Sequence, residues 1–169
     1  EQVCAFIVVR DELQRLPSSL QHHRQLGVHR FIVIDNGSSD GTVEYLLEQA
    51  DVHLFQTLGS YQEARNGIDW IEMLLHAYGQ RCWCVLLDAD EHFIYPECES
   101  LSLPAFCVAL SERGLNCLAT LFLDVYSPLP IAQTVIARDD LPLEVCHFFD
   151  PTGYYHLPST ASALPRIYG

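Results

Sequence analysis

The sequence predicts an α/β fold, a Rossmann-like three-layer sandwich with a mostly parallel central sheet. Three observations carry this prediction. Strand-like and helix-like hydrophobic patterns alternate through residues 3–87. The first run, 3–9, is apolar at every position, as in a strand that is buried on both faces. Acidic residues follow three of the expected strands, at the edge where sheets of this class bind ligands.

The bounds of the expected elements follow from turn residues and from hydrophobic period. Pro17 suits the first turn of a helix and Gly27 suits its end, while Ser39 or Asp40 can cap the next helix. Gly79 closes a long helix whose apolar residues recur at spacings of three and four. The expected strands are 3–9, 31–34, 52–55 and 82–87. The expected helices between them are 17–27, 42–50 and 61–78. A helix over 104–113 and a fifth strand over 116–125 follow.

The length of 169 residues suits one domain with a sizeable core, so we predict a single domain over 1–169. Beyond residue 127 the hydrophobic pattern weakens, which predicts an irregular C-terminal part. The sequence does not begin with Met and stops at Gly169 without a closing element. We therefore interpret it as a fragment of a longer protein.

Charge and composition exclude several functions. Nine basic and 22 acidic residues give a net charge of −13, which argues against a nucleic-acid partner. All nine basic residues are Arg, and the absence of Lys excludes a Walker A phosphate loop and Schiff-base catalysis. No apolar run approaches the roughly 18–20 residues of a membrane span. We therefore expect no membrane span in this chain.

Seven cysteines are an odd number for a disulfide scaffold, and four of them lie in apolar runs: Cys4, Cys82, Cys84 and Cys117. We expect these four to be buried and reduced, which favours a cytoplasmic protein. Zinc at Cys82 and Cys84 is disfavoured because no second pair exists. His22 and His23 are adjacent in the expected first helix and point about 100° apart, so we interpret both as helix surface.

Acidic residues gather where the expected strands end, at 11–12, at Asp35 and at 88–91. They can be solvated turn formers, but three such groups at one sheet edge favour a shared site. Asp88 and Asp90 place hard oxygen ligands on one short turn, which Mg²⁺ or Mn²⁺ binds together with substrate phosphates. An acidic protein without Lys needs such a cation to hold a phosphorylated ligand.

Several motifs resemble, in order and spacing, those of a family 2 glycosyltransferase. They are VVRDE at 8–12, DNGSSDGT at 35–42, ARNG at 64–67 and LDADE at 87–91. Together with the segments between them they cover roughly residues 3–95. Looser similarity at 123–127 and 165–169 points to a bacterial subgroup.

The resemblance implies a GT-A-type fold that binds a nucleotide-diphosphate sugar, with a UDP-sugar as the first expectation, and a divalent cation, Mn²⁺ or Mg²⁺. Residues 1–95 would form the donor-binding core, and 96–169 the start of an incomplete acceptor-side region. The implied activity is transfer of the sugar, with inversion, to an unknown glycan, lipid or protein acceptor. The implied location is cytoplasmic, or peripheral at the inner face of the membrane.

Carried over position by position, the resemblance assigns roles to four donor-binding side chains outside the DADE turn. Asp35 would hydrogen-bond the nucleobase. Arg10 and Glu12 would line the nucleotide pocket at the end of the first strand. Arg65 would reach the base or the diphosphate from the third helix.

The resemblance also assigns the metal ligands. Asp88 would contact the ribose or the metal, and Asp90 would ligate the metal that bridges the two phosphates. Inversion by direct displacement also needs a general base for the acceptor hydroxyl. Asp124, at the end of the expected fifth strand, is the candidate base in this chain. The acidic pair that usually supplies the base has no convincing counterpart, so we expect the base beyond Gly169.

Two other functions fit parts of the pattern. Lack of a base suits a non-catalytic module that binds a nucleotide sugar without transferring it. A Mg²⁺-dependent phosphatase or phosphotransferase of the haloacid dehalogenase type would use the first Asp of D-x-D as a nucleophile. That motif usually follows the first strand, whereas here it follows the fourth. Phosphate release from a generic phosphoester would identify this second alternative.

Overall fold

The computed structural model describes residues 1–137, 140, 142–153, 155–157 and 166–168. The chain divides into two compact units, Glu1–Arg113 and Gly114–Gly169. Among the residues described, no helix is both long and apolar enough to cross a membrane.

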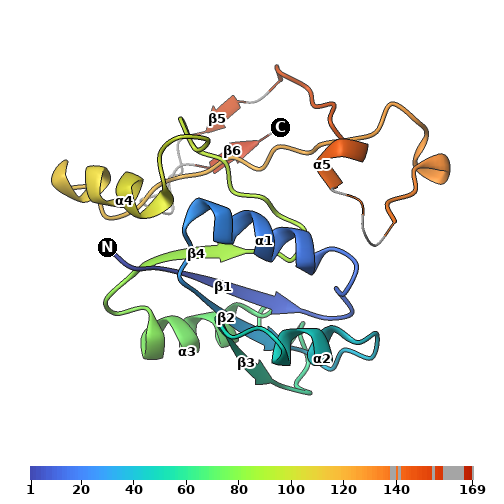
Figure 1. Cartoon of the computed structure of the whole chain (residues 1–169), viewed down its shortest axis with the longest axis horizontal. Helices are drawn as coiled ribbons and strands as arrows, with labels where there is room; N and C mark the ends of the chain where they lie inside the picture. Colours follow the sequence, from blue (N-terminus) through green and yellow to red (C-terminus); the bar gives the residue numbers. More distant parts are fainter. Residues whose placement is uncertain (138–139, 141, 154, 158–165, 169) are drawn as a thin grey trace. The chain divides into compact units, whose positions relative to one another are not determined.

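A four-stranded parallel sheet forms the centre of the first unit, in the order β3-β2-β1-β4 (Figure 1). Its strands are β1 (Val3–Val9), β2 (Arg30–Asp35), β3 (Val52–Gln56) and β4 (Trp83–Leu87). The chain builds outward from β1 to β3 and then returns to add β4 on the other side of β1. The strand order therefore reverses between β1 and β4, and the predicted parallel α/β sheet is confirmed.

Helices cover both faces of this sheet. They are α1 (Leu16–Leu26), α2 (Thr42–Leu47), α3 (Ile68–Tyr78) and α4 (Leu103–Glu112). Leu20 of α1, Leu46 of α2 and Leu103 of α4 share one core cluster with β1. Leu74 of α3 packs with Phe6 in a second cluster on the opposite face. The expected three layers are thus present.

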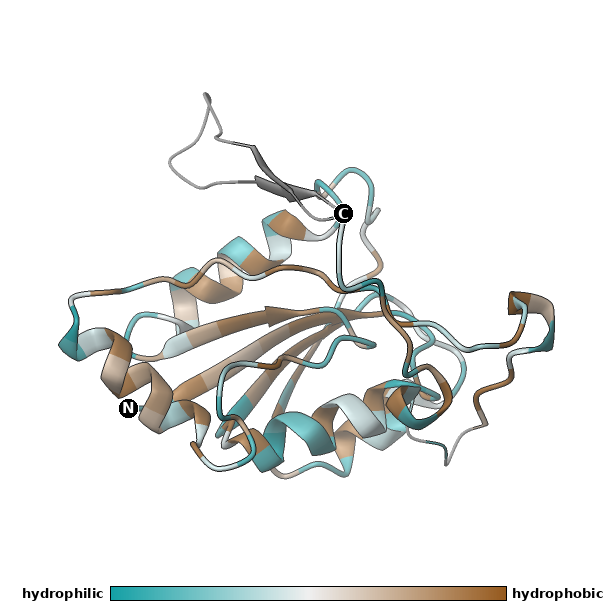
Figure 2. Ribbon diagram, turned by 90° about the horizontal axis from the view of Figure 1, so that it is seen from above, coloured by the Kyte–Doolittle hydropathy of each residue, from teal (hydrophilic) through white to brown (hydrophobic). Residues whose placement is uncertain are grey.

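β1 is apolar at every position because both of its faces are covered. Val3, Ala5 and Ile7 face the α1 side, while Cys4 and Phe6 face the α3 side. All five are at most 5% exposed. Figure 2 shows the strands as the most hydrophobic part of the first unit. This burial fixes the register of the sheet and hence the positions of its strand ends.

The helix bounds differ from the predicted ones where backbone turns intervene. α3 begins at Ile68 rather than at residue 61, because 61–67 forms turns with positive φ at Arg65, Asn66 and Gly67. α1 ends as predicted at Gly27, whose φ is +98°. A Cβ at Gly27 would lie 2.9 Å from Pro104 Cδ, so glycine also permits the close approach of α4.

The second unit is irregular over most of its described residues, as predicted. It contains a 3₁₀ turn η1 (Ile131–Gln133), a short helix α5 (Pro142–Val145) and the antiparallel strands β5 (Tyr155–Leu157) and β6 (Arg166–Tyr168). The predicted strand over 116–125 is wrong. Within the described residues this segment pairs with no other strand, and strand backbone needs such pairing to satisfy its polar groups.

All seven cysteines are free thiols. Cys4 is buried as predicted, and Cys82 and Cys84 are half-buried. The prediction for Cys117 is wrong, because its side chain is exposed on the segment that does not form a strand.

Candidate functional site

A cleft of about 350 Å³ opens at the carboxyl ends of β1 and β4. This is the point where the strand order reverses, and open α/β sheets bind their ligands there. The volume is within the range of small-molecule sites. The described residues that line the cleft all belong to the first unit: Val8, Val9, Arg10, Glu12, Asn36, Tyr61, Asp88, Ala89 and Asp90.

The loop after β1 is braced by the turn after β2. Asp11, with φ of +55°, donates its N–H to Ser38 Oγ and accepts the N–H of Ser39 at 2.7 Å. The N–H of Glu12 donates to Thr42 Oγ1 at 3.0 Å. Part of the DNGSSDGT motif therefore holds the loop that carries Arg10 and Glu12 to the cleft.

Arg15 links two carboxylates of the cleft, a contact that the sequence analysis missed. Its Nε and Nη2 donate to Glu12 at 2.8 and 2.9 Å, and its Nη1 lies 3.4 Å from Asp90 Oδ2. Burial raises the pKa of Glu12, while the Arg15 charge opposes that shift. Arg15 is thus a cation held between the loop after β1 and the acidic turn after β4.

Asp88 and Asp90 lie on one turn at the end of β4, as the motif predicted. Burial first, and then the charge of Asp90, raise the pKa of Asp88. Burial also raises the pKa of Glu91, whose carboxylate accepts the N–H of Asp88 at 2.8 Å. The raised pKa values reflect burial first and then the negative charge of neighbouring carboxylates, and a bound cation would oppose both effects.

These carboxylates suit a divalent ion that takes only a few of its ligands from the protein. In the part of the chain that the structure describes, no group of three or more His, Cys, Asp or Glu side chains is arranged to hold a metal. Mg²⁺ needs only one or two protein carboxylates when water and phosphate complete its shell, and hard oxygen ligands also suit Mn²⁺. Asp88 and Asp90 can supply that pair, with a phosphorylated ligand completing it.

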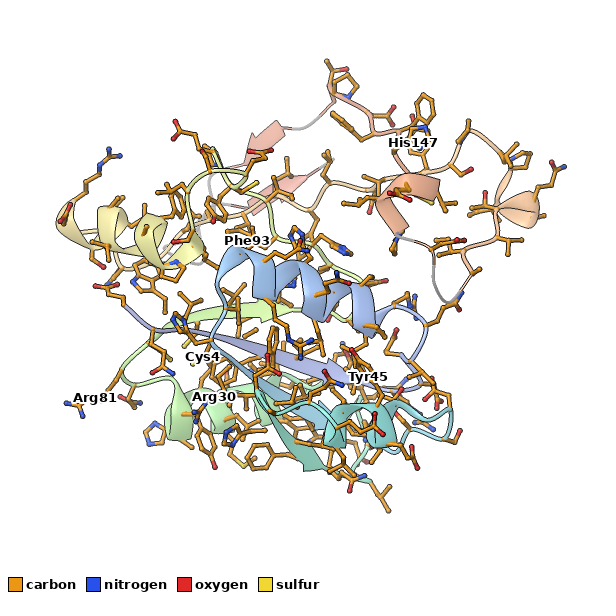
Figure 3. The ribbon with its side chains drawn as sticks, viewed as in Figure 1. Cys4, Arg30, Tyr45, Arg81, Phe93 and His147 are labelled. Carbon is orange, nitrogen blue, oxygen red and sulfur yellow. The ribbon has the colours of Figure 1, made fainter. Side chains whose placement is uncertain are left out.

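One face of α1 fastens the segment that follows the acidic turn. Ser19 Oγ donates to Glu91 O at 3.1 Å, and His22 Nε2 donates to Phe93 O at 2.9 Å. The N–H of Phe93 donates to His23 Nε2 at 3.3 Å. Figure 3 shows Phe93 beside α1. The position of the acidic turn therefore depends on this helix.

The prediction that His23 lies on the helix surface is wrong, since its side chain is fully buried. Its Nδ1 donates to Ser19 O at 2.7 Å, which leaves Nε2 to accept the N–H of Phe93. Burial lowers the pKa of His23 to about 4. The ring centroids of His22 and His92 lie 4.9 Å apart, and burial lowers the pKa of His92 as well.

Asp35 is fully buried and does not line the cleft. Its carboxylate accepts the backbone N–H groups of Gly37 at 3.1 Å and Ser38 at 3.2 Å. Asn36 takes the lining position and donates to Thr57 O and Gly59 O at 3.1 and 3.0 Å. In this structure Asp35 shapes the turn, and its predicted contact with a nucleobase stays a prediction.

Arg65 and Asp124 are not among the lining residues. Arg65 extends along α3, where it pairs with Asp69 and with Glu72 at 2.5 Å. Asp124 is an exposed residue of the second unit. Their predicted roles in donor binding and in base catalysis stay predictions.

Sequence reasoning missed Tyr61, the aromatic member of the cleft lining. Its ring lies 6.2 Å from that of Trp70, centroid to centroid. One signal could have indicated Tyr61, because it lies shortly after the third expected strand, at the ligand-binding edge of the sheet.

Comparison with known proteins finds two matches to a glycosyltransferase family 92 protein of Ricinus communis. The first is 25% identical over 166 residues and covers 94% of this chain and 25% of the relative. This chain is similar to a glycosyltransferase. The second match is 24% identical over 161 residues and covers 94% and 24%, respectively. The chain thus spans about a quarter of the length of the curated relatives it matches.

The family named in these matches differs from the family 2 that the motifs predicted. The broader prediction of a glycosyltransferase agrees with the relatives, while family 2 itself is not confirmed. No family model matches the sequence. Among solved structures, residues 1–349 of TarS from S. aureus align with a TM-score of 0.45 and 14% identity, covering 75% of this chain and 41% of TarS.

Proposed function

We propose that this chain carries the donor site of a metal-dependent glycosyltransferase. The donor is a nucleotide-diphosphate sugar, with a UDP-sugar as the first candidate, and the acceptor is a hydroxyl of a glycan, lipid or protein. The observation that carries the proposal is the cleft between β1 and β4, where Asp88 and Asp90 lie beside Arg10 and Glu12. The glycosyltransferase relative supports the reaction class.

In the proposed reaction the acceptor oxygen bonds to the anomeric carbon as the bond from that carbon to the diphosphate oxygen breaks. The configuration inverts, and the acceptor proton passes to a general base. A bound Mn²⁺ or Mg²⁺ would stabilise the charge on the leaving diphosphate. Asp88 and Asp90 would hold that ion, and Arg10 would contribute a positive charge to the same cleft.

The other three predicted residues, Asp124, Arg65 and Asp35, fit this proposal to different degrees. Asp124 is the candidate base within the chain, and it belongs to the second unit. Arg65 would have to leave its ion pairs with Asp69 and Glu72 before it could bind a donor. Asp35 supports the proposal indirectly, because the turn that it holds braces the loop of Arg10 and Glu12.

Calorimetric titration of UDP, with and without Mn²⁺, tests the donor and metal assignments together. The wild-type chain is expected to bind UDP more tightly when Mn²⁺ is present. Asp90→Asn removes one charged ligand and is expected to weaken Mn²⁺-dependent binding by about tenfold or more. Asp88→Asn is expected to act in the same direction.

Glu48→Gln provides the matched control, because it removes the same charge from an exposed position at the end of α2. It is expected to leave UDP binding within about twofold of wild type. Unchanged affinity in both aspartate variants would show that the metal assignment is wrong. Donor binding without transfer to any acceptor tested would instead favour the binding module, and phosphate release from a generic phosphoester would favour the phosphatase.

A further inference from the structure

The segment between β3 and α3 brings an aromatic ring to the cleft. Tyr61 lines the cleft and is 44% exposed, so part of its side chain is accessible to a ligand. Trp70 of α3 packs against Tyr61, with the two rings inclined by 56°. The Tyr61 ring is therefore supported by the protein core while remaining accessible from the cleft.

Gly67 leaves the space that this ring occupies. A Cβ built on Gly67 would lie 2.8 Å from Tyr61 Cε2, closer than real Cβ contacts allow. Gly67 also has φ of +80°, which side chains rarely adopt. Any larger residue at this position would push the ring from its place.

The backbone around Tyr61 is strained. Arg65, Asn66 and Gly67 have consecutive φ values of +49°, +58° and +80°, and the first two are not glycine. The turn is held by hydrogen bonds from Gly67 N to Tyr61 O at 3.2 Å and from Ala64 N to Ser60 O at 3.1 Å. Strain of this kind persists where the surrounding structure enforces it, often at ligand sites.

The cleft thus offers two kinds of surface. Val8, Val9, Ala89 and the Tyr61 ring are apolar or aromatic, whereas the polar lining carries charges of both signs. A ligand that matches both has a flat ring at one end and an anionic, metal-binding group at the other. A nucleoside diphosphate has this form. Asp35, the side chain expected to contact the base, is buried outside this lining.

We propose that Tyr61 is the stacking surface for the nucleobase of the donor. The inference deepens the proposed function and rests on it. It assigns base affinity to Tyr61 and metal-dependent phosphate affinity to the carboxylate pair. Stacking on an aromatic ring accepts any base, so a further group must choose between bases.

The test compares Tyr61→Leu with Tyr61→Phe in the whole chain, by calorimetry with UDP, GDP and ADP in the presence of Mn²⁺. Leu keeps apolar contact with Trp70 but removes the flat ring, whereas Phe keeps the ring. For the diphosphate that wild type binds most tightly, Leu is expected to weaken affinity about tenfold and Phe by less than about twofold. Mn²⁺-dependent binding of inorganic pyrophosphate, which has no base, is expected to change less than about twofold in both variants.

Tyr78→Ala is the control, because Tyr78 is an aromatic residue of α3 that is 47% exposed and does not line the cleft. Equal losses for pyrophosphate and nucleotide in Tyr61→Leu would overturn the stacking role, and so would full nucleotide affinity in that variant. In either case, the proposed function would stand if wild type shows Mn²⁺-dependent binding and Asp90→Asn loses it. A wild-type chain that binds none of the three nucleotides would overturn both.

Discussion

At the scale of single residues, His23 shows how burial fixes a protonation state. Its Nε2 accepts a backbone N–H, and a proton on that nitrogen would face a donor at a position without solvent access. Burial accordingly lowers the pKa of His23 to about 4, whereas an unfolded histidine titrates near 6.5. The folded state therefore binds this proton less readily than the unfolded state does.

This difference predicts how stability changes with pH. The contribution of neutral His23 is fully present above about pH 6.5 and is lost as pH falls toward about 4, because the unfolded state takes up the proton first. The expected loss is about 3 kcal/mol of unfolding free energy. Urea unfolding between pH 7.5 and 4.5 measures it. His23→Gln lacks the titrating group and is expected to show a shallower pH dependence, whereas parallel curves for the two proteins would contradict the assignment.

At the scale of elements, Arg15 couples the start of α1 to the acidic turn after β4. Its guanidinium already places a positive charge 3.4 Å from Asp90 Oδ2. A divalent ion bound at Asp90 would compete with that contact. Arg15→Ala is therefore expected to tighten binding of Mn²⁺ alone by about threefold, the size expected for an exposed ion pair.

Titration calorimetry with MnCl₂ measures the change, and Arg10→Ala is its control. Arg10 also lines the cleft, yet it forms no ion pair with another of the described residues. Removing Arg10 measures how much the loss of one positive charge in the cleft changes the affinity for Mn²⁺. Mn²⁺ affinity that rises no more for Arg15→Ala than for Arg10→Ala would argue against direct competition.

The elements of the first unit were largely predictable from the sequence, because each buries its own periodic face. β1 has the bounds that its apolar run predicted, and α1 ends at the predicted glycine. The prediction of a strand over 116–125 was wrong because apolar composition does not reveal whether a partner strand exists. The prediction that His23 is exposed was wrong for a similar reason, since the segment that packs over its side chain, 91–93, lies far along the chain. The position of the acidic turn was predictable from D-x-D. The contact of Arg15 with the cleft carboxylates and the place of Tyr61 in the cleft lining depend on loop geometry, which periodicity does not encode.

At the scale of the whole molecule, the described residues that line the cleft belong to one of the two compact units. Each of these lining residues lies within Glu1–Arg113. Helix α1, which fastens the acidic turn, and the loop that carries Tyr61 lie in the same unit. The unit has core clusters on both faces of its sheet. Donor binding in the proposed function should therefore need only this unit, whereas the candidate base Asp124 lies in the other.

A chain that ends at Arg113 tests this division. We expect residues 1–113 to unfold in one cooperative transition and to bind UDP with Mn²⁺ within about twofold of the 169-residue chain. Calorimetric titration measures the affinity, and thermal unfolding with and without UDP measures the folding and its linkage to binding. Asp90→Asn in the short chain is the control, since it should weaken Mn²⁺-dependent binding by about tenfold or more, as in the 169-residue chain. A short chain that folds cooperatively but has lost UDP binding would show that the second unit contributes contacts to the donor, so that the cleft of the first unit is only part of the site.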